Sequence, residues 1–143
     1  EGVFDDGEGE LSDAACVFDW LQQYNTNSKI CWVAGFSFGA WIAMQLLMRR
    51  PEINGFVSVS PPANLRDFSF LAPCPSSGLI VHGDKDNIAS FDSTKILVEK
   101  LQKQKKVDIR FKPIKGAEHF YENYSSELED SIKNYIKETL QKN

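Results

Sequence analysis

Apolar residues recur along this chain with two kinds of spacing, one typical of helices and one typical of buried strands. In residues 11–24 they recur at i, i+3, i+4 and i+7, which predicts an amphipathic helix. Similar patterns predict helices over 38–49 and 90–103, and a last helix whose apolar face spans 128–140. The helices are separated by shorter segments of a different character.

Those segments are predicted strands. Residues 30–34, 56–60 and 79–82 are short apolar runs, whereas 107–111 alternates apolar and charged positions and therefore predicts a half-exposed edge strand. Strands and helices alternate throughout, so we expect an α/β fold, a three-layer sandwich in which helices cover both faces of a mostly parallel sheet. The segment 61–78 is rich in proline and serine, which predicts a loop with at most one short helical turn.

Composition narrows the classes of function. The chain has 143 residues and a net charge of −4, so we interpret 1–143 as a single domain that binds neither nucleic acid nor an anionic membrane. Neither a cofactor nor a metal site is predicted, since Cys16, Cys31 and Cys74 lack metal-like spacing. Their odd number favours reduced thiols, and hence a cytoplasmic protein.

The pattern G-x-S-x-G lies between a predicted strand and a predicted helix, at residues 35–39. A serine on such a strand–turn–helix projects its hydroxyl above the sheet edge, and the flanking glycines, Gly35 and Gly39, supply the room. The backbone N–H of Phe38, at the start of the helix, would point toward negative charge that develops on a substrate. This context predicts Ser37 as a nucleophile.

A serine hydroxyl needs a neighbouring base, and the chain has only two histidines. His119 lies in a loop that leaves the carboxyl end of the sheet, where Ser37 must also lie, whereas His82 ends a strand and favours a structural role. The imidazole in turn needs a carboxylate. Asp86 is placed to reach the histidine loop, and two alternatives remain open: Asp84, which could instead organise its turn, and Glu118, adjacent to His119.

Three motifs carry a resemblance to a known family: GFSFG at 35–39, HGDKD at 82–86 and GAEHF at 116–120. With them the chain resembles α/β-hydrolases, close to the small cap-less members related to dienelactone hydrolases. The resemblance implies Ser37 as nucleophile, Asp86 as acid, His119 as base and the Phe38 N–H as one oxyanion-hole donor. Dienelactone hydrolases proper usually carry cysteine at the position of Ser37. This difference leaves the substrate undetermined, whereas acyl transfer is still expected.

The resemblance also implies that strands precede the acidic start of the chain in the family. We therefore expect the C-terminal half of an α/β-hydrolase fold, about four strands, truncated at its N-terminus. The second oxyanion donor would come from the missing part. Because 61–78 is too short for a cap, we expect an open site, with candidate acyl-pocket residues that could equally be core: Phe36, Leu65, Phe68, Phe70 and Phe120.

The resulting hypothesis is hydrolysis of a small-molecule ester, or secondarily an amide, through an acyl-Ser37 intermediate. One alternative is a remnant that keeps the triad but lacks half of the oxyanion hole, and another is a non-catalytic binding module. Strand 30–34 is apolar on both faces with no lysine or proline. Such an open edge pairs readily with another chain, which predicts a homodimer or higher oligomer.

Overall fold

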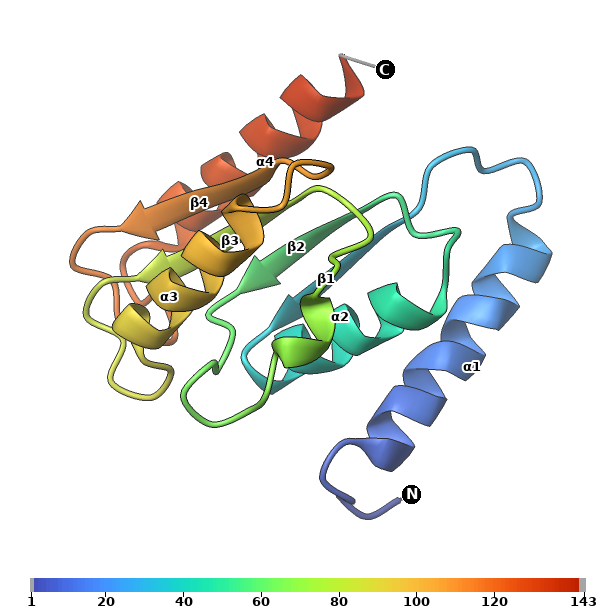
Figure 1. Ribbon diagram of the computed structural model, residues 1–143, viewed down its shortest axis with the longest axis horizontal. Coiled ribbons are helices and arrows are strands. Elements are labelled where there is room, and N and C mark those ends of the chain that lie inside the picture. The colour runs from blue at the N-terminus through green and yellow to red at the C-terminus, as the bar shows by residue number, and fades with distance from the viewer. Residues whose placement is uncertain (1, 142–143) are drawn as a thin grey trace.

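The computed structural model describes residues 2–141 and contains one four-stranded parallel sheet with strand order β1-β2-β3-β4 (Figure 1). The elements along the chain are α1 (Glu8–Tyr24), β1 (Trp32–Phe36), α2 (Phe38–Arg49), β2 (Gly55–Val59), a short 3-10 turn (Ser69–Leu71), β3 (Gly78–Gly83), α3 (Phe91–Gln102), β4 (Ile109–Ile114) and α4 (Ser125–Leu140).

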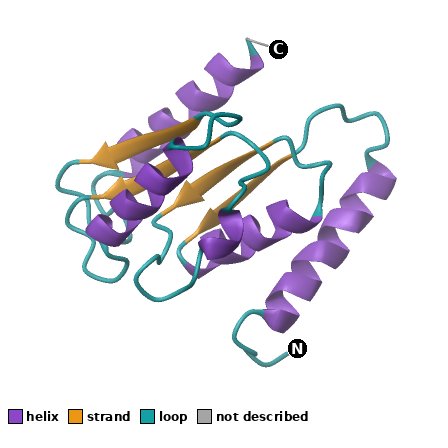
Figure 2. Cartoon of the chain, viewed as in Figure 1, coloured by secondary structure: helices purple, strands orange, loops and turns teal. Residues whose placement is uncertain are grey.

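Helices α2 and α3 cover one face of the sheet, α4 covers the other, and α1 packs on α2 (Figures 1 and 2). Successive residues of a strand point to opposite faces, so Phe56 and Ile80 join the core beneath α2 and α3, while Val57 and Val81 join the core beneath α4. The predicted three-layer α/β sandwich is confirmed.

Several boundaries differ from the predicted ones. The first strand lies at 32–36 rather than 30–34, because the backbone stays paired with β2 through Gly35 and Phe36 up to the serine. The last strand runs to 114 and contains Pro113, which an outer strand tolerates because one side of its backbone needs no partner. Helix α1 begins at Glu8, since the carboxylate of Glu10 accepts the Gly7 N–H at 2.9 Å.

The outer strand β1 and helix α1 carry apolar side chains that are exposed to solvent. Strand β1 is the outer strand on the α1 side; its last residue, Phe36, is 42% exposed, and Ile30, two residues before the strand, is 44% exposed. The face of α1 that points away from α2 also carries exposed apolar side chains, namely Val17, Trp20, Leu21 and Tyr24.

Within residues 2–141, none of the helices is both long and apolar enough to cross a membrane.

Candidate active site

The turn between β1 and α2 has an unusual backbone. Ser37 adopts φ 52° and ψ −121°, a region that L-residues seldom occupy, and its N–H is anchored on the Val59 carbonyl at 2.9 Å. A Cβ on Gly35 would lie 2.2 Å from the Gly39 carbonyl oxygen, so this position requires glycine. The same expectation for Gly39 is wrong, because a Cβ there would meet nothing within 4 Å among the described residues.

The strained serine lies against His119. The Nε2 atom of His119 is 2.9 Å from the Ser37 Oγ, and its Nδ1 atom is 2.7 Å from Oδ2 of Asp86. An ionised carboxylate only accepts hydrogen bonds, so Nδ1 donates to Asp86 and the lone pair of Nε2 faces the serine hydroxyl. The side chains of His119 and Asp86 are 4% and 0% exposed. Three strand ends thus bring a serine, a histidine and an aspartate into one line of contacts.

Asp86 is held as an anion although it is buried. Burial alone would raise the pKa of its carboxyl group, but hydrogen bonds from His119 and from the backbone N–H groups of Ile88 and Ala89 outweigh that effect and lower the pKa below its ordinary value. The two amides lie 2.9 and 2.8 Å from Oδ1, which leaves Oδ2 for the imidazole. Each carboxylate oxygen therefore has its own donors.

The alternative acids take other positions. Asp84 accepts the Gly116 N–H at 2.7 Å and ties the loop after β3 to the loop after β4, which is the turn-organising role considered for it. The side chain of Glu118 is exposed, and Nδ1 of His119 is already bonded to Asp86. The structure brings together Ser37, His119 and Asp86 and leaves Asp84 and Glu118 outside this line of contacts.

His82 is fully buried and contacts Asp86 rather than the serine. Its Nε2 atom lies 3.0 Å from the Ala89 carbonyl oxygen and 3.3 Å from Oδ2 of Asp86. Burial lowers the pKa of His82 and outweighs the opposing effects of Ala89 and Asp86. The structural role expected for this histidine agrees with these contacts.

A second polar contact, which the sequence analysis did not foresee, lies beneath the histidine loop. The hydroxyl groups of Ser60, after β2, and Tyr121, after His119, are 2.8 Å apart and buried. Both residues have positive φ, 47° and 55°. Burial raises the pKa of Tyr121 to about 12, so its hydroxyl stays protonated. The available signals were weak: a serine at a strand end, and a tyrosine two positions after the histidine.

The proposed pocket residues fall into two groups. The rings of Phe36 and Phe120 both contact His119, with centroids 5.0 and 5.1 Å from the imidazole, and are 42% and 68% exposed. The side chain of Leu65 is 63% exposed. Phe68 is 6% exposed and belongs to the core, with Phe70 stacked on it and packed against the same core. Placing Phe68 and Phe70 in an acyl pocket at the serine is therefore corrected.

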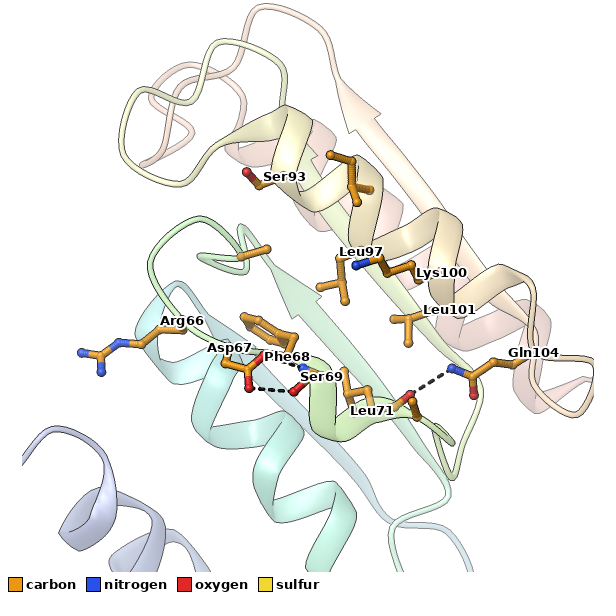
Figure 3. Close-up of a pocket in the computed structure, with 13 residues that line it drawn as sticks. Arg66, Asp67, Phe68, Ser69, Leu71, Ser93, Leu97, Lys100, Leu101 and Gln104 are labelled. Atoms are coloured by element: carbon orange, nitrogen blue, oxygen red, sulfur yellow. Dashed lines mark hydrogen bonds between the residues drawn. The ribbon is translucent and has the colours of Figure 1, made fainter.

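Phe68 instead lines a groove away from the serine (Figure 3). This groove, about 520 Å³ in volume, runs between the loop that contains the 3-10 turn and helix α3. Leu97 and Leu101 project into it from α3, and Gln104 closes one end through a 2.9 Å hydrogen bond from its amide to the Leu71 carbonyl. Its lining includes none of the three residues in contact at the serine.

Comparison with known proteins places this geometry in a family. The chain is 54% identical to a protein of unknown function from Agrobacterium tumefaciens, described as a candidate α/β hydrolase, with a TM-score of 0.96 over 99% of this chain and 65% of that one. A Xanthomonas campestris protein, described as an α/β serine hydrolase without lid, is 27% identical, with a TM-score of 0.82 over 96% of this chain and 60% of that one.

A curated relative is the uncharacterised protein of Rickettsia prowazekii, which is 51% identical over 140 residues, or 95% of this chain. The chain spans 59% of the length of that relative. The family pattern of the dienelactone hydrolases matches residues 5–142, nearly the whole sequence. The chain therefore belongs to the dienelactone hydrolase family and has an α/β-hydrolase fold.

Proposed function

We propose that the protein is a serine hydrolase that cleaves carboxylic esters through an acyl-Ser37 intermediate. The observation that carries this proposal is the line of contacts Asp86–His119–Ser37, with distances of 2.7 and 2.9 Å, at a backbone turn that holds the serine in a strained conformation. Membership of a hydrolase family supports the same class of reaction.

The chemistry follows from the donor and acceptor roles. The Ser37 Oγ attacks the ester carbonyl carbon while its proton passes to Nε2 of His119, and Asp86 stabilises the imidazolium that forms. The C–O bond to the alcohol then breaks, and His119 returns the proton to the departing oxygen. Water repeats the sequence on the acyl-serine, with His119 again as base, and releases the acid.

Negative charge on the carbonyl oxygen needs a hydrogen-bond donor during both steps. Phe38 is the first residue of α2, and the first N–H groups of a helix have no partner within it. The helix dipole adds positive potential at the same place. The Phe38 N–H is therefore the proposed oxyanion donor on this chain.

The surroundings of the serine suit a substrate with an apolar part. Phe36 and Phe120 present partly exposed rings beside His119, 6.2 Å apart between centroids. Segment 61–78 contains only the short 3-10 turn Ser69–Leu71, and the Xanthomonas campestris relative is described as lacking a lid. An open site of this kind favours small esters over substrates that need enclosure.

Burst kinetics with p-nitrophenyl esters of two to eight acyl carbons test the proposal. We expect one equivalent of p-nitrophenol to be released rapidly, followed by steady turnover, and Ser37→Ala should lower turnover about 10⁴-fold or more. Ser12→Ala, on the exposed face of α1, is the matched control and should behave as the wild type.

The outcomes separate the competing hypotheses. Slow release of the first equivalent of p-nitrophenol with poor later turnover would favour the catalytically weakened remnant, because loss of one oxyanion donor costs about 10²–10³ in turnover. Faster cleavage of a p-nitroanilide than of the matching ester would show that the preferred substrate is an amide and not an ester. Turnover that persists in Ser37→Ala would refute the role of the serine.

A further inference from the structure

His82 is a buried ionisable group that the proposed reaction does not use. It is the second-last residue of β3 and is 0% exposed. Its Nε2 atom approaches two oxygens, the carbonyl of Ala89 at 3.0 Å and Oδ2 of Asp86 at 3.3 Å. Its Nδ1 atom has no hydrogen-bond partner among the described residues.

These contacts fix the protonation of the ring. A carbonyl oxygen only accepts hydrogen bonds, so Nε2 carries the proton and Nδ1 carries the lone pair. A second proton on Nδ1 would be buried without an acceptor among the described residues, in a ring that packs near Phe91 with centroids 5.8 Å apart. Burial accordingly lowers the pKa of His82. The ring is a neutral donor with one orientation.

The donor belongs to a closed set of contacts around the catalytic carboxylate. Ala89 donates its N–H to Oδ1 of Asp86 at 2.8 Å, and its carbonyl oxygen accepts the hydrogen bond from Nε2–H of His82. The same Nε2–H group lies beside Oδ2, the oxygen that accepts the hydrogen bond from Nδ1–H of His119. His82 therefore touches the turn that carries Asp86 and the very oxygen that orients the base.

We propose that His82 is a positioning residue: it anchors the 86–89 turn and faces Oδ2 of Asp86 so that the carboxylate stays aligned with His119. The inference rests on the proposed function, since alignment matters only if His119 acts as a base. A residue that merely filled space in the core would need no N–H group within 3.3 Å of that oxygen.

Two substitutions distinguish the role of the His82 N–H donor from that of the side-chain volume. His82→Gln can place an amide N–H near the position of Nε2, whereas His82→Leu has a similar volume but no donor and leaves the Ala89 carbonyl unsatisfied. We expect His82→Leu to lower kcat about 10–100-fold, the size typical for groups that orient a catalytic side chain, with KM within about twofold. His82→Gln should recover most of the loss. His82→Asn, whose shorter amide cannot reach Ala89, replaces the leucine variant if that variant does not fold.

Proton NMR supplies a readout that does not depend on turnover. The charge-assisted Nδ1–H bond between His119 and Asp86 should give a strongly downfield resonance in the wild type, absent in His119→Asn. We expect it to be retained in His82→Gln and to broaden or vanish in folded His82→Leu or His82→Asn. A sharp, unshifted resonance with unchanged kcat in a folded donor-free variant would overturn the role of His82. Absence of the resonance in the wild type would overturn this inference and the proposed triad together, whereas a normal resonance without ester cleavage would count against the proposed function alone.

Discussion

His119 and Asp86 lie among buried groups, whereas Ser37 lies at the end of the strand on the open side of the sheet. On the acid–base side, Asp86 receives donors on both oxygens and His82 supports its turn. Strand β3 beneath it is buried along its whole length. On the serine side, β1 is only partly buried, and the orientation of Ser37 depends on its own backbone and on Gly35.

The difference shows two ways to orient the side chains of the proposed triad. Asp86 and His119 are oriented by hydrogen bonds between side chains and backbone, so their alignment depends on chemical identity at several positions. The serine is oriented by backbone geometry, so its alignment depends on the absence of a side chain at Gly35. Substitutions around Asp86 and His119 should therefore lower mainly the rate of ester hydrolysis, whereas a substitution at Gly35 should lower mainly the stability of the fold.

The largest expected effect is on the rate and comes from the acid–base side. Asp86→Asn keeps the shape of the side chain but removes the charge that fixes the tautomer of His119, and it should lower kcat about 10⁴-fold. Asp84→Asn is the matched control, because its amide oxygen can still accept the Gly116 N–H. Equal losses in the two variants, measured by ester hydrolysis, would show that Asp86 has no special role.

On the serine side, the two glycines of the motif should respond in opposite ways. Gly35→Ala places a Cβ against the Gly39 carbonyl, and we expect it to lower the free energy of unfolding by about 3 kcal/mol. Gly39→Ala meets open space within α2 and should be neutral or stabilise by about 0.5 kcal/mol, because alanine favours helix. Urea unfolding measures both. Equal destabilisation would contradict the account of this turn.

The buried His82 beside Asp86 should also affect how the free energy of unfolding depends on pH. Burial lowers the pKa of His82, so the folded protein keeps it neutral, while the unfolded chain binds a proton below about pH 6.5. The free energy of unfolding should therefore fall as the pH drops below that value, by up to about 1.4 kcal/mol per unit from this residue. Urea unfolding at pH 7.5 and 5.5 should show a smaller drop for His82→Gln than for the wild type. Identical drops would refute a neutral buried His82.

The smallest expected effect concerns the open edge beside the serine. We propose that β1 pairs with its counterpart in a second copy, because an outer strand that is only partly buried invites backbone pairing. Ala34→Lys places a charge on an exposed position of this strand and should weaken association about tenfold or more. Sedimentation equilibrium at micromolar concentration measures this. A wild-type monomer would refute the pairing.

The sequence predicted the strand–helix alternation and the three-layer fold, because the apolar runs of β2 and β3 and the helical spacing of α1 and α3 are local signals. It also singled out Ser37, Asp86 and His119, whose motifs stand at strand ends. It could not predict the contact between Ser60 and Tyr121 or that of His82 with Asp86, since these depend on how separate loops meet above the sheet. Whether Phe68 lies in a pocket or in the core stayed open for the same reason, because composition alone does not distinguish the two.

Reaction with a fluorophosphonate ester tests the central claim most directly, because it requires only an activated serine and no particular substrate. Intact-mass and peptide analysis of the labelled protein should find one phosphonyl group per chain, located on Ser37. The label should be absent in Ser37→Ala and should form much more slowly in Asp86→Asn, while Asp84→Asn reacts like the wild type. A label on another residue, or one that persists in Ser37→Ala, would contradict the assignment of Ser37 as the nucleophile.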